Sequence, residues 1–138
     1  MTGTAAIRSR TLTDSADSLL RFAMRLDATL TGAFGLAVAA FAGPLSSLTG
    51  LNSSVEYILG AAFVLYGVVV YLLAGVPNVR SAGLAVIVAN IVCTLAAVLV
   101  VVEGIAPLTG VGVAVTLATG LYTAVFAVLQ YVGVRRLA

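Results

Sequence analysis

Strongly polar side chains are rare in this sequence, and those inside long apolar stretches are the candidates for chemistry. Asn90 is the clearest, because it lies near the middle of residues 81–102, which carry no charge. A side-chain amide in hydrocarbon must find a hydrogen-bonding partner in the protein or in a bound molecule. Asn90 therefore predicts either a helix–helix contact or a ligand site, and both interpretations stay open.

Other polar residues are expected at a similar depth. Counting about 1.5 Å of rise per residue places Asn90 roughly 13 Å from the nearer membrane surface. The same depth falls near Tyr66 on the preceding apolar stretch and near Tyr122 and Thr123 on the following one, and Thr94 lies one turn beyond Asn90. Such a polar layer joins helices, or it binds a lipid, a quinone or a small polar solute. The candidates are Asn90, Thr94, Tyr66, Tyr122, Thr123 and, nearer the surface, Gln130.

Asp27 stands where the first apolar stretch begins, two residues after Arg25. Arg80 and Arg135 are expected at the same membrane surface, so an ion pair with Asp27 at the mouth of a helical bundle is predicted. The alternative is a proton or cation site. Small multidrug-resistance transporters, which are also short four-span proteins, carry an acid inside the first helix, whereas residues 28–42 hold none. This difference disfavours a proton-coupled antiporter.

The sequence offers no catalytic constellation. It contains no histidine, and Cys93 is its only cysteine, so an internal disulfide and the usual zinc sites are excluded. No serine or cysteine has a base beside it, and no glycine-rich phosphate loop is present. We expect no enzyme activity, no metal and no cofactor. The seven arginines flank the apolar stretches as membrane topology requires, so no nucleic-acid partner is expected.

Four apolar stretches must position these residues. The chain is 62% hydrophobic and 9% charged, whereas soluble domains are about 45–50% apolar and about 25% charged. An all-α transmembrane bundle of four helices, running up-down-up-down, is therefore predicted for residues 14–138, with a short amphipathic helix before the first span. Residues 1–13 are expected to form a disordered tail. The predicted spans are residues 27–48, 55–76, 81–102 and 110–132.

All arginines lie in the N-terminal segment, in the loop between the second and third spans, or in the C-terminal segment. With four spans, these three segments share one side of the membrane. The positive-inside rule then places both termini in the cytoplasm, for a protein of the plasma (inner) membrane.

Small residues recur four apart on three spans, which lets helices approach closely. On the third span this row is expected to face a neighbouring helix. The expected packing positions are Gly35, Ala39, Gly43, Ala85, Ala89, Gly112 and Gly120. At the start of the second span, Ser53 and Glu56 have the spacing of a capping box.

Three segments carry a resemblance to a known group of proteins. They are RLDATLTGAFGLAVAAFAGP (25–44), VANIVCTLAAVLVVVEG (88–104) and FAVLQYVGVRR (126–136). These segments resemble a set of small four-span integral membrane proteins of actinobacteria and other bacteria, which share an Arg-Leu-Asp-Ala start, an Asn in the third span and a Leu-Gln before the end. The matching positions are Asp27, Asn90 and Gln130. The resemblance implies fold and topology, and it implies no activity.

Two functions remain as hypotheses. The first is a non-enzymatic accessory or scaffold subunit of a larger membrane complex, of respiratory or lipid-transport type, because small-residue rows on three spans exceed what one bundle buries. The second is a small self-associating transporter or a lipid- or quinone-binding protein that uses the polar layer around Asn90. The expected partners are membrane lipids and either other membrane subunits or a second copy of the chain.

Overall fold

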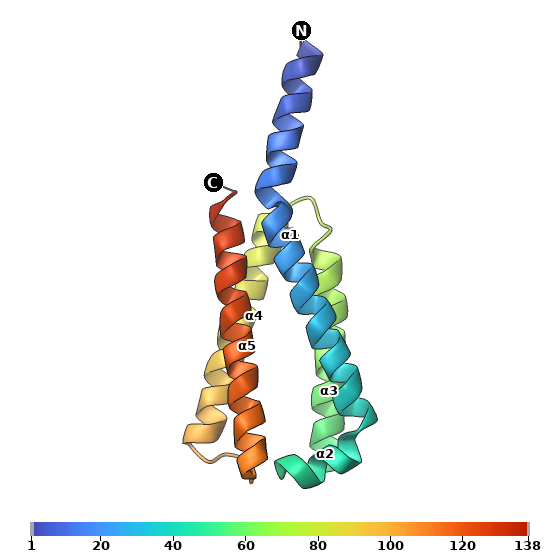
Figure 1. Cartoon of the computed structure of the whole chain (residues 1–138), viewed down its shortest axis with the longest axis vertical. Coiled ribbons are helices and arrows are strands. Elements are labelled where there is room, and N and C mark those ends of the chain that lie inside the picture. The colour runs from blue at the N-terminus through green and yellow to red at the C-terminus, as the bar shows by residue number, and fades with distance from the viewer. Residues whose placement is uncertain (1, 138) are drawn as a thin grey trace.

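The chain folds into helices throughout the computed structural model, which describes residues 2–137 and the side chains of residues 17–137. Four long helices run alternately up and down, and a short helix lies across the end of the bundle opposite the C-terminus (Figure 1). The all-α, up-down-up-down bundle predicted from the sequence is confirmed. In chain order the helices are α1 (Thr2–Ala40), α2 (Ala42–Thr49), α3 (Ser53–Leu73), α4 (Val79–Val102) and α5 (Gly110–Arg135).

The four long helices have the length and composition of membrane spans. Large apolar side chains cover the outside of the bundle: Ile58, Leu72 and Leu121 are each more than 60% exposed. A helix that is apolar on its outer face needs lipid around it. The protein is therefore a multi-pass integral membrane protein, whose candidate spans are Asp17–Ala40, Ser53–Leu73, Val79–Val102 and Gly110–Arg135.

Helix α1 begins earlier than predicted. Residues 2–13, expected as a disordered tail, are helical, and the amphipathic segment from residue 14 continues directly into the span; Met1 lies outside the described residues. The physical reason is that no proline, and after Gly3 no glycine, interrupts the chain before Gly32. Asp27 lies within the candidate span Asp17–Ala40, and it contacts Tyr66, Asn90 and Gln130 inside the bundle.

The first span also ends earlier than the predicted residue 48. The chain kinks at Phe41, and α2 begins at Ala42. Pro44 lies in the first turn of α2, where its missing N–H costs nothing, while its ring would clash with the carbonyl one turn earlier in a continuous helix. Contrary to prediction, Gly43 does not extend the packing row of α1, because nothing lies within 4 Å of the position that a Cβ would take there.

Helix α3 is capped by a different residue from the one predicted. The side chain of Asn52 accepts a hydrogen bond of 2.7 Å from the backbone N–H of Ser54. The expected capping box of Ser53 and Glu56 does not form. Glu56 is buried and accepts a hydrogen bond from the hydroxyl of Thr49 instead. Its carboxylate thus ties α2 to α3.

The C-terminal end of α3 is held by an arginine of α1. Nη1 of Arg21 donates to the carbonyl oxygens of Ala74 and Val76, at 2.8 and 2.9 Å, and Nη2 lies 3.2 Å from Oδ2 of Asp17. The last carbonyls of a helix lack partners within the helix and carry partial negative charge. Ala74 is the C-cap residue of α3 and Val76 lies in the turn after it, so Arg21 ties the end of α3 and this turn to α1.

Glycines allow α1 and α3 to approach closely, in one of the two most extensive helix contacts of the bundle; the other joins α4 and α5. A Cβ on Gly35 would lie 2.6 Å from the carbonyl oxygen of Gly60, and one on Gly67 would lie 2.6 Å from that of Ala28. Ala39 also lies against Gly60. Gly35 and Ala39, two of the predicted packing positions, are thus in the interface.

Helix α5 brings its small residues to two neighbours. A Cβ on Gly112 would lie 2.1 Å from the carbonyl oxygen of Thr49, and one on Gly120 would lie 3.2 Å from Cβ of Ala97 on α4. The predicted packing positions Gly112 and Gly120 therefore both face the interior.

Helix α4 turns a different face inward from the one predicted. Ala85 is exposed and Ala89 only half-buried, whereas Gly83, Val86 and Asn90 are buried. Residues four apart drift by about 40° per step on a helix of 3.6 residues per turn. The row through Ala85 and Ala89 therefore leaves the side that Asn90 occupies, and it faces out of the bundle.

Candidate functional site

The carboxylate of Asp27 is the centre of the buried polar residues. Its side chain is fully buried, and five side chains lie within 3.0 Å of its oxygens. They come from all four spans. Oδ1 accepts from Thr31 and Tyr122, both at 3.0 Å, and Oδ2 accepts from Tyr66 at 2.9 Å, Asn90 at 3.0 Å and Gln130 at 2.9 Å. We call Asp27 and these five residues the Asp27 centre.

The donors of the Asp27 centre also contact one another. Nδ2 of Asn90 donates to Oε1 of Gln130 at 2.9 Å, and the hydroxyl of Tyr66 lies 3.4 Å from Oδ1 of Asn90. The hydroxyls of Thr31 and Tyr122 are 3.0 Å apart. Asn90 has two amide hydrogens, one for the carboxylate and one for Gln130, whereas the hydroxyl of Tyr66 shares its single hydrogen between Asp27 and Asn90.

Thr94 and Thr123 form a second polar contact, one helical turn beyond Asn90 on α4. Their hydroxyls are 2.7 Å apart. Thr94 also donates to the carbonyl oxygens of Asn90 and Gly120, at 3.0 and 3.2 Å. Neither hydroxyl reaches Asp27, so this pair joins α4 to α5 beside the centre.

The predicted polar layer thus separates into two groups. Asn90, Tyr66, Tyr122 and Gln130 meet around one carboxylate, while Thr94 and Thr123 pair with each other. Thr31, which also donates to Asp27, is not among the predicted residues. Its spacing of one helical turn from Asp27 places both on the same face of α1, and this spacing could have identified it.

The predicted ion pair of Asp27 with Arg80 or Arg135 is not formed. Both arginines are exposed, and the ion pair among the side chains of residues 17–137 joins Asp17 and Arg21. The prediction placed Asp27 at the membrane surface. Because α1 begins before the span, Asp27 lies too deep for arginines at the helix ends to reach it.

The buried carboxylate of Asp27 is therefore stabilised by hydrogen bonds from uncharged side chains. A carboxylate without hydrogen bonds is very costly in a low-dielectric interior, and an ionised carboxylate only accepts hydrogen bonds. All five side chains can donate to Asp27, and no buried side-chain nitrogen or oxygen among residues 17–137 lacks a partner. The Asp27 centre is thus organised to hold negative charge inside the bundle.

Oxygen atoms dominate the same centre, and this determines what it can bind. One carboxylate, two amide carbonyls and three hydroxyls are ligands of the hard type that suits alkali cations and protons. No cluster of three or more His, Cys, Asp or Glu side chains occurs in the part of the chain with described side chains. In this structure the hydroxyl and amide groups direct hydrogens at the carboxylate, so their own oxygens do not converge on one point.

Three residues meet at one atom, Oδ2 of Asp27. They are the positions that match the resemblance noted above: Asp27, Asn90 and Gln130. Nδ2 of Asn90 and Nε2 of Gln130 both donate to Oδ2 of Asp27. The three residues come from α1, α4 and α5, so their contact joins three spans. In comparisons with known proteins, no family model, no curated protein and no solved structure matches this chain.

Proposed function

We propose that this protein is a small, non-enzymatic membrane transporter in which Asp27 binds and releases a proton or a monovalent cation. The observation that supports it is the fully buried carboxylate surrounded by five neutral donors from all four spans. An acid at the centre of a span costs about 2.5–3.5 kcal/mol on insertion scales. Neutral residues would join the helices at lower cost, so the retained charge favours a role that needs it.

The contacts suggest how occupancy would be coupled to helix packing. Hydroxyl groups donate in one rotamer and accept in another, and an amide presents its oxygen after rotation. A cation bound at Asp27 would attract these oxygens and displace the donated hydrogens. Because the donors lie on α1, α3, α4 and α5, binding and release would shift the preferred packing of the spans, as alternating access requires.

Ion flux into liposomes tests this function. Wild-type protein is reconstituted and challenged separately with gradients of H⁺, Na⁺ and K⁺, and currents are recorded on a solid-supported membrane. We expect a current with at least one of the three ions and its loss in Asp27→Asn. The matched control is Glu103→Gln, which removes an exposed acid at the end of α4 and should keep the current. No current with any ion in wild type, or an undiminished current in Asp27→Asn, would overturn the proposal.

A second variant tests the same function if Asp27→Asn does not fold. Thr31→Val removes one donor and leaves the acid and the other four donors in place. We expect the current to persist, with the half-saturating ion concentration changed severalfold. Size-exclusion chromatography and thermal unfolding in detergent confirm the fold of each variant.

A role as an accessory or scaffold subunit is the second candidate, and the outward face of α4 favours it. Ser81, Ala85 and Cys93 are exposed and Ala89 is half-buried on this face, where small side chains would admit another helix. Native purification in mild detergent tests this role. A stoichiometric larger membrane partner that is lost in Ala85→Leu but kept in Val88→Leu would support it. A homodimer with the same sensitivity would instead support self-association.

We infer the orientation from the ends of the bundle. Figure 1 shows the N-terminal part of α1 and the C-terminus extending from the same end. Arg80, Arg135 and Arg136 lie at this end, beside the start of α4 and the end of α5. By the positive-inside rule, this end faces the cytoplasm.

A further inference from the structure

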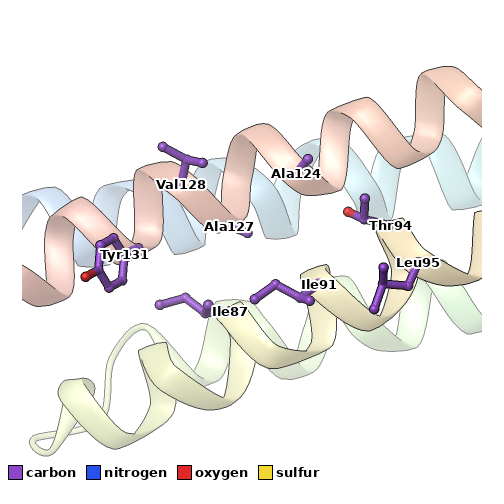
Figure 2. Close-up of a pocket in the computed structure, with 8 residues that line it drawn as sticks. All are labelled: Ile87, Ile91, Thr94, Leu95, Ala124, Ala127, Val128 and Tyr131. Atoms are coloured by element: carbon purple, nitrogen blue, oxygen red, sulfur yellow. The ribbon is translucent and has the colours of Figure 1, made fainter. Parts of the chain in front are cut away.

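A groove runs along the outside of the bundle between α4 and α5. Figure 2 shows Ile87, Ile91 and Leu95 along one wall, and Ala124, Ala127 and, at one end, Tyr131 along the other. The aliphatic side chains of α4 face alanines on α5, so the space between the helices is only partly filled. The groove has a volume of about 320 Å³, near the lower limit for small-ligand sites.

Two arginines extend beyond the same end of this groove. Arg80 precedes Ile87 by seven residues on α4, and Arg135 follows Tyr131 by four on α5, so each lies on the face of its helix that lines the groove. The two helix ends are adjacent, because a Cβ on Gly83 would lie 3.3 Å from Val134. Both arginines therefore lie near the open end where Tyr131 is found.

Neither arginine has an acid partner among the side chains of residues 17–137. Both side chains are exposed, and neither takes part in the ion pair found among residues 17–137. The guanidinium carbon of Arg135 lies 5.9 Å from the ring centroid of Tyr131, which holds it at the end of the groove. An apolar groove that ends at two unpaired cations matches a molecule with an apolar chain and an anionic head.

We propose that this groove binds one acyl chain of an anionic phospholipid, whose phosphate lies between Arg80 and Arg135. The groove extends for about 12 Å along α4, from Ile87 to Leu95, at 1.5 Å per residue, which suits part of an acyl chain. Guanidinium groups bind phosphate oxygens in pairs of hydrogen bonds, and long arginine side chains reach the headgroup level while their stems stay in the apolar region. The site is separate from the Asp27 centre and does not depend on the transport function.

Lipid retention from membranes of known composition tests the site. Wild-type protein is reconstituted in nanodiscs of phosphatidylcholine and phosphatidylglycerol at four to one, extracted in mild detergent and examined by native mass spectrometry. We expect one retained phosphatidylglycerol per chain and little phosphatidylcholine. The double variant Arg80→Gln/Arg135→Gln should retain roughly 30-fold less, since each arginine near an anionic surface contributes roughly fivefold. Arg25→Gln, which removes an exposed arginine of α1, is the matched control and should retain the lipid.

A variant within the groove tests the acyl chain separately. Ala124→Leu adds three carbons to a half-buried wall position, and it should displace the lipid while both arginines remain. Thermal unfolding in detergent identifies variants that fail to fold. If either the arginine double variant or Ala124→Leu does not fold, lipid retention by the other one tests the site. Equal retention of the two lipids by wild type would overturn the proposal. Retention in the arginine double variant equal to that in Arg25→Gln would do the same, as would a membrane protein bound in place of lipid and lost in Ala124→Leu.

Discussion

Gln130 and Asp27 are 103 residues apart in the chain, and Nε2 of Gln130 donates a hydrogen bond of 2.9 Å to Oδ2 of Asp27. The oxygen of the same amide accepts a hydrogen bond of 2.9 Å from Asn90. One fully buried amide thus links the acid on α1 to the amide on α4. The Asp27 centre therefore depends on the relative axial positions of α1, α4 and α5.

Replacing Gln130 should be costly. Gln130→Leu removes a donor to Asp27 and the acceptor of Asn90, so we expect a loss of about 1–3 kcal/mol in the free energy of unfolding. This exceeds the average of about 0.6 kcal/mol for an interhelical hydrogen bond in a membrane. Unfolding in mixed detergent and SDS micelles measures it. Thr119→Val on the same helix, whose hydroxyl donates to the carbonyl of Val115 within its own helix, should change little.

Gln130→Glu tests whether the charge at position 130, rather than the shape of its side chain, determines stability. This change keeps the size of the side chain and places a second carboxylate beside Asp27, where two negative charges in a low-dielectric interior repel. We expect a larger loss of stability than for Gln130→Leu. A variant as stable as wild type would mean that the two carboxyl groups share a proton, so that the pair does not carry two negative charges.

The depth of Asp27 could not be derived from its neighbours in the sequence. Arg21 and Arg25 precede it, and their charges indicated a membrane surface at the start of the first apolar stretch. Arg21 instead turns to the end of α3, so the helix enters the span before Asp27. The partners of Arg21 are carbonyls more than 50 residues away in the chain, so the residues around Arg21 do not predict this contact.

The span count and the alternating topology followed from apolar length alone, because every backbone group in a bilayer must be paired within its own helix. The inward face of α4 did not follow. Its residues are apolar around the whole helix, so the spacing of small residues was the available guide, and Ala85 and Ala89 lie on the wrong side. Asn90 marks the inward face, and tracing its neighbours at three and four residues would have found Gly83 and Val86.

Gly67 in the α1–α3 interface and Gly43 on the exposed side of α2 differ sharply in their tolerance of a methyl group. A Cβ at Gly67 would lie 2.6 Å from the carbonyl oxygen of Ala28, and backbone atoms cannot move aside cheaply. Gly67→Ala should cost about 1–3 kcal/mol in the free energy of unfolding. Gly43→Ala, where a Cβ meets nothing within 4 Å, should be neutral or stabilising by up to about 1 kcal/mol. Equal effects of the two changes, measured by thermal unfolding, would contradict the close packing of α1 and α3.

Arg21 and Arg25 provide a matched pair for the end of α3. Arg21→Gln loses charge-assisted hydrogen bonds to the carbonyls of Ala74 and Val76, so we expect a loss of about 1–2 kcal/mol and faster hydrogen exchange in the last turn of α3. Arg25 is exposed, and Arg25→Gln should leave both measurements unchanged. Indistinguishable exchange in the two variants would rule out Arg21 as the group that fixes this helix end.

The orientation of the bundle can be read by chemical labelling. In a Cys93→Ala background, Ser47→Cys places a thiol on exposed α2 and Asn78→Cys places one at the exposed start of α4, at opposite ends of the bundle. If the arginine-rich end faces the cytoplasm, a membrane-impermeant maleimide should label the thiol at position 47 in intact cells and the thiol at position 78 only after lysis. Leu121→Cys, on the lipid-facing side of α5, should resist the reagent in both cases. The opposite pattern at positions 47 and 78 would reverse the orientation, and it would place Arg80 and Arg135 on the outer surface.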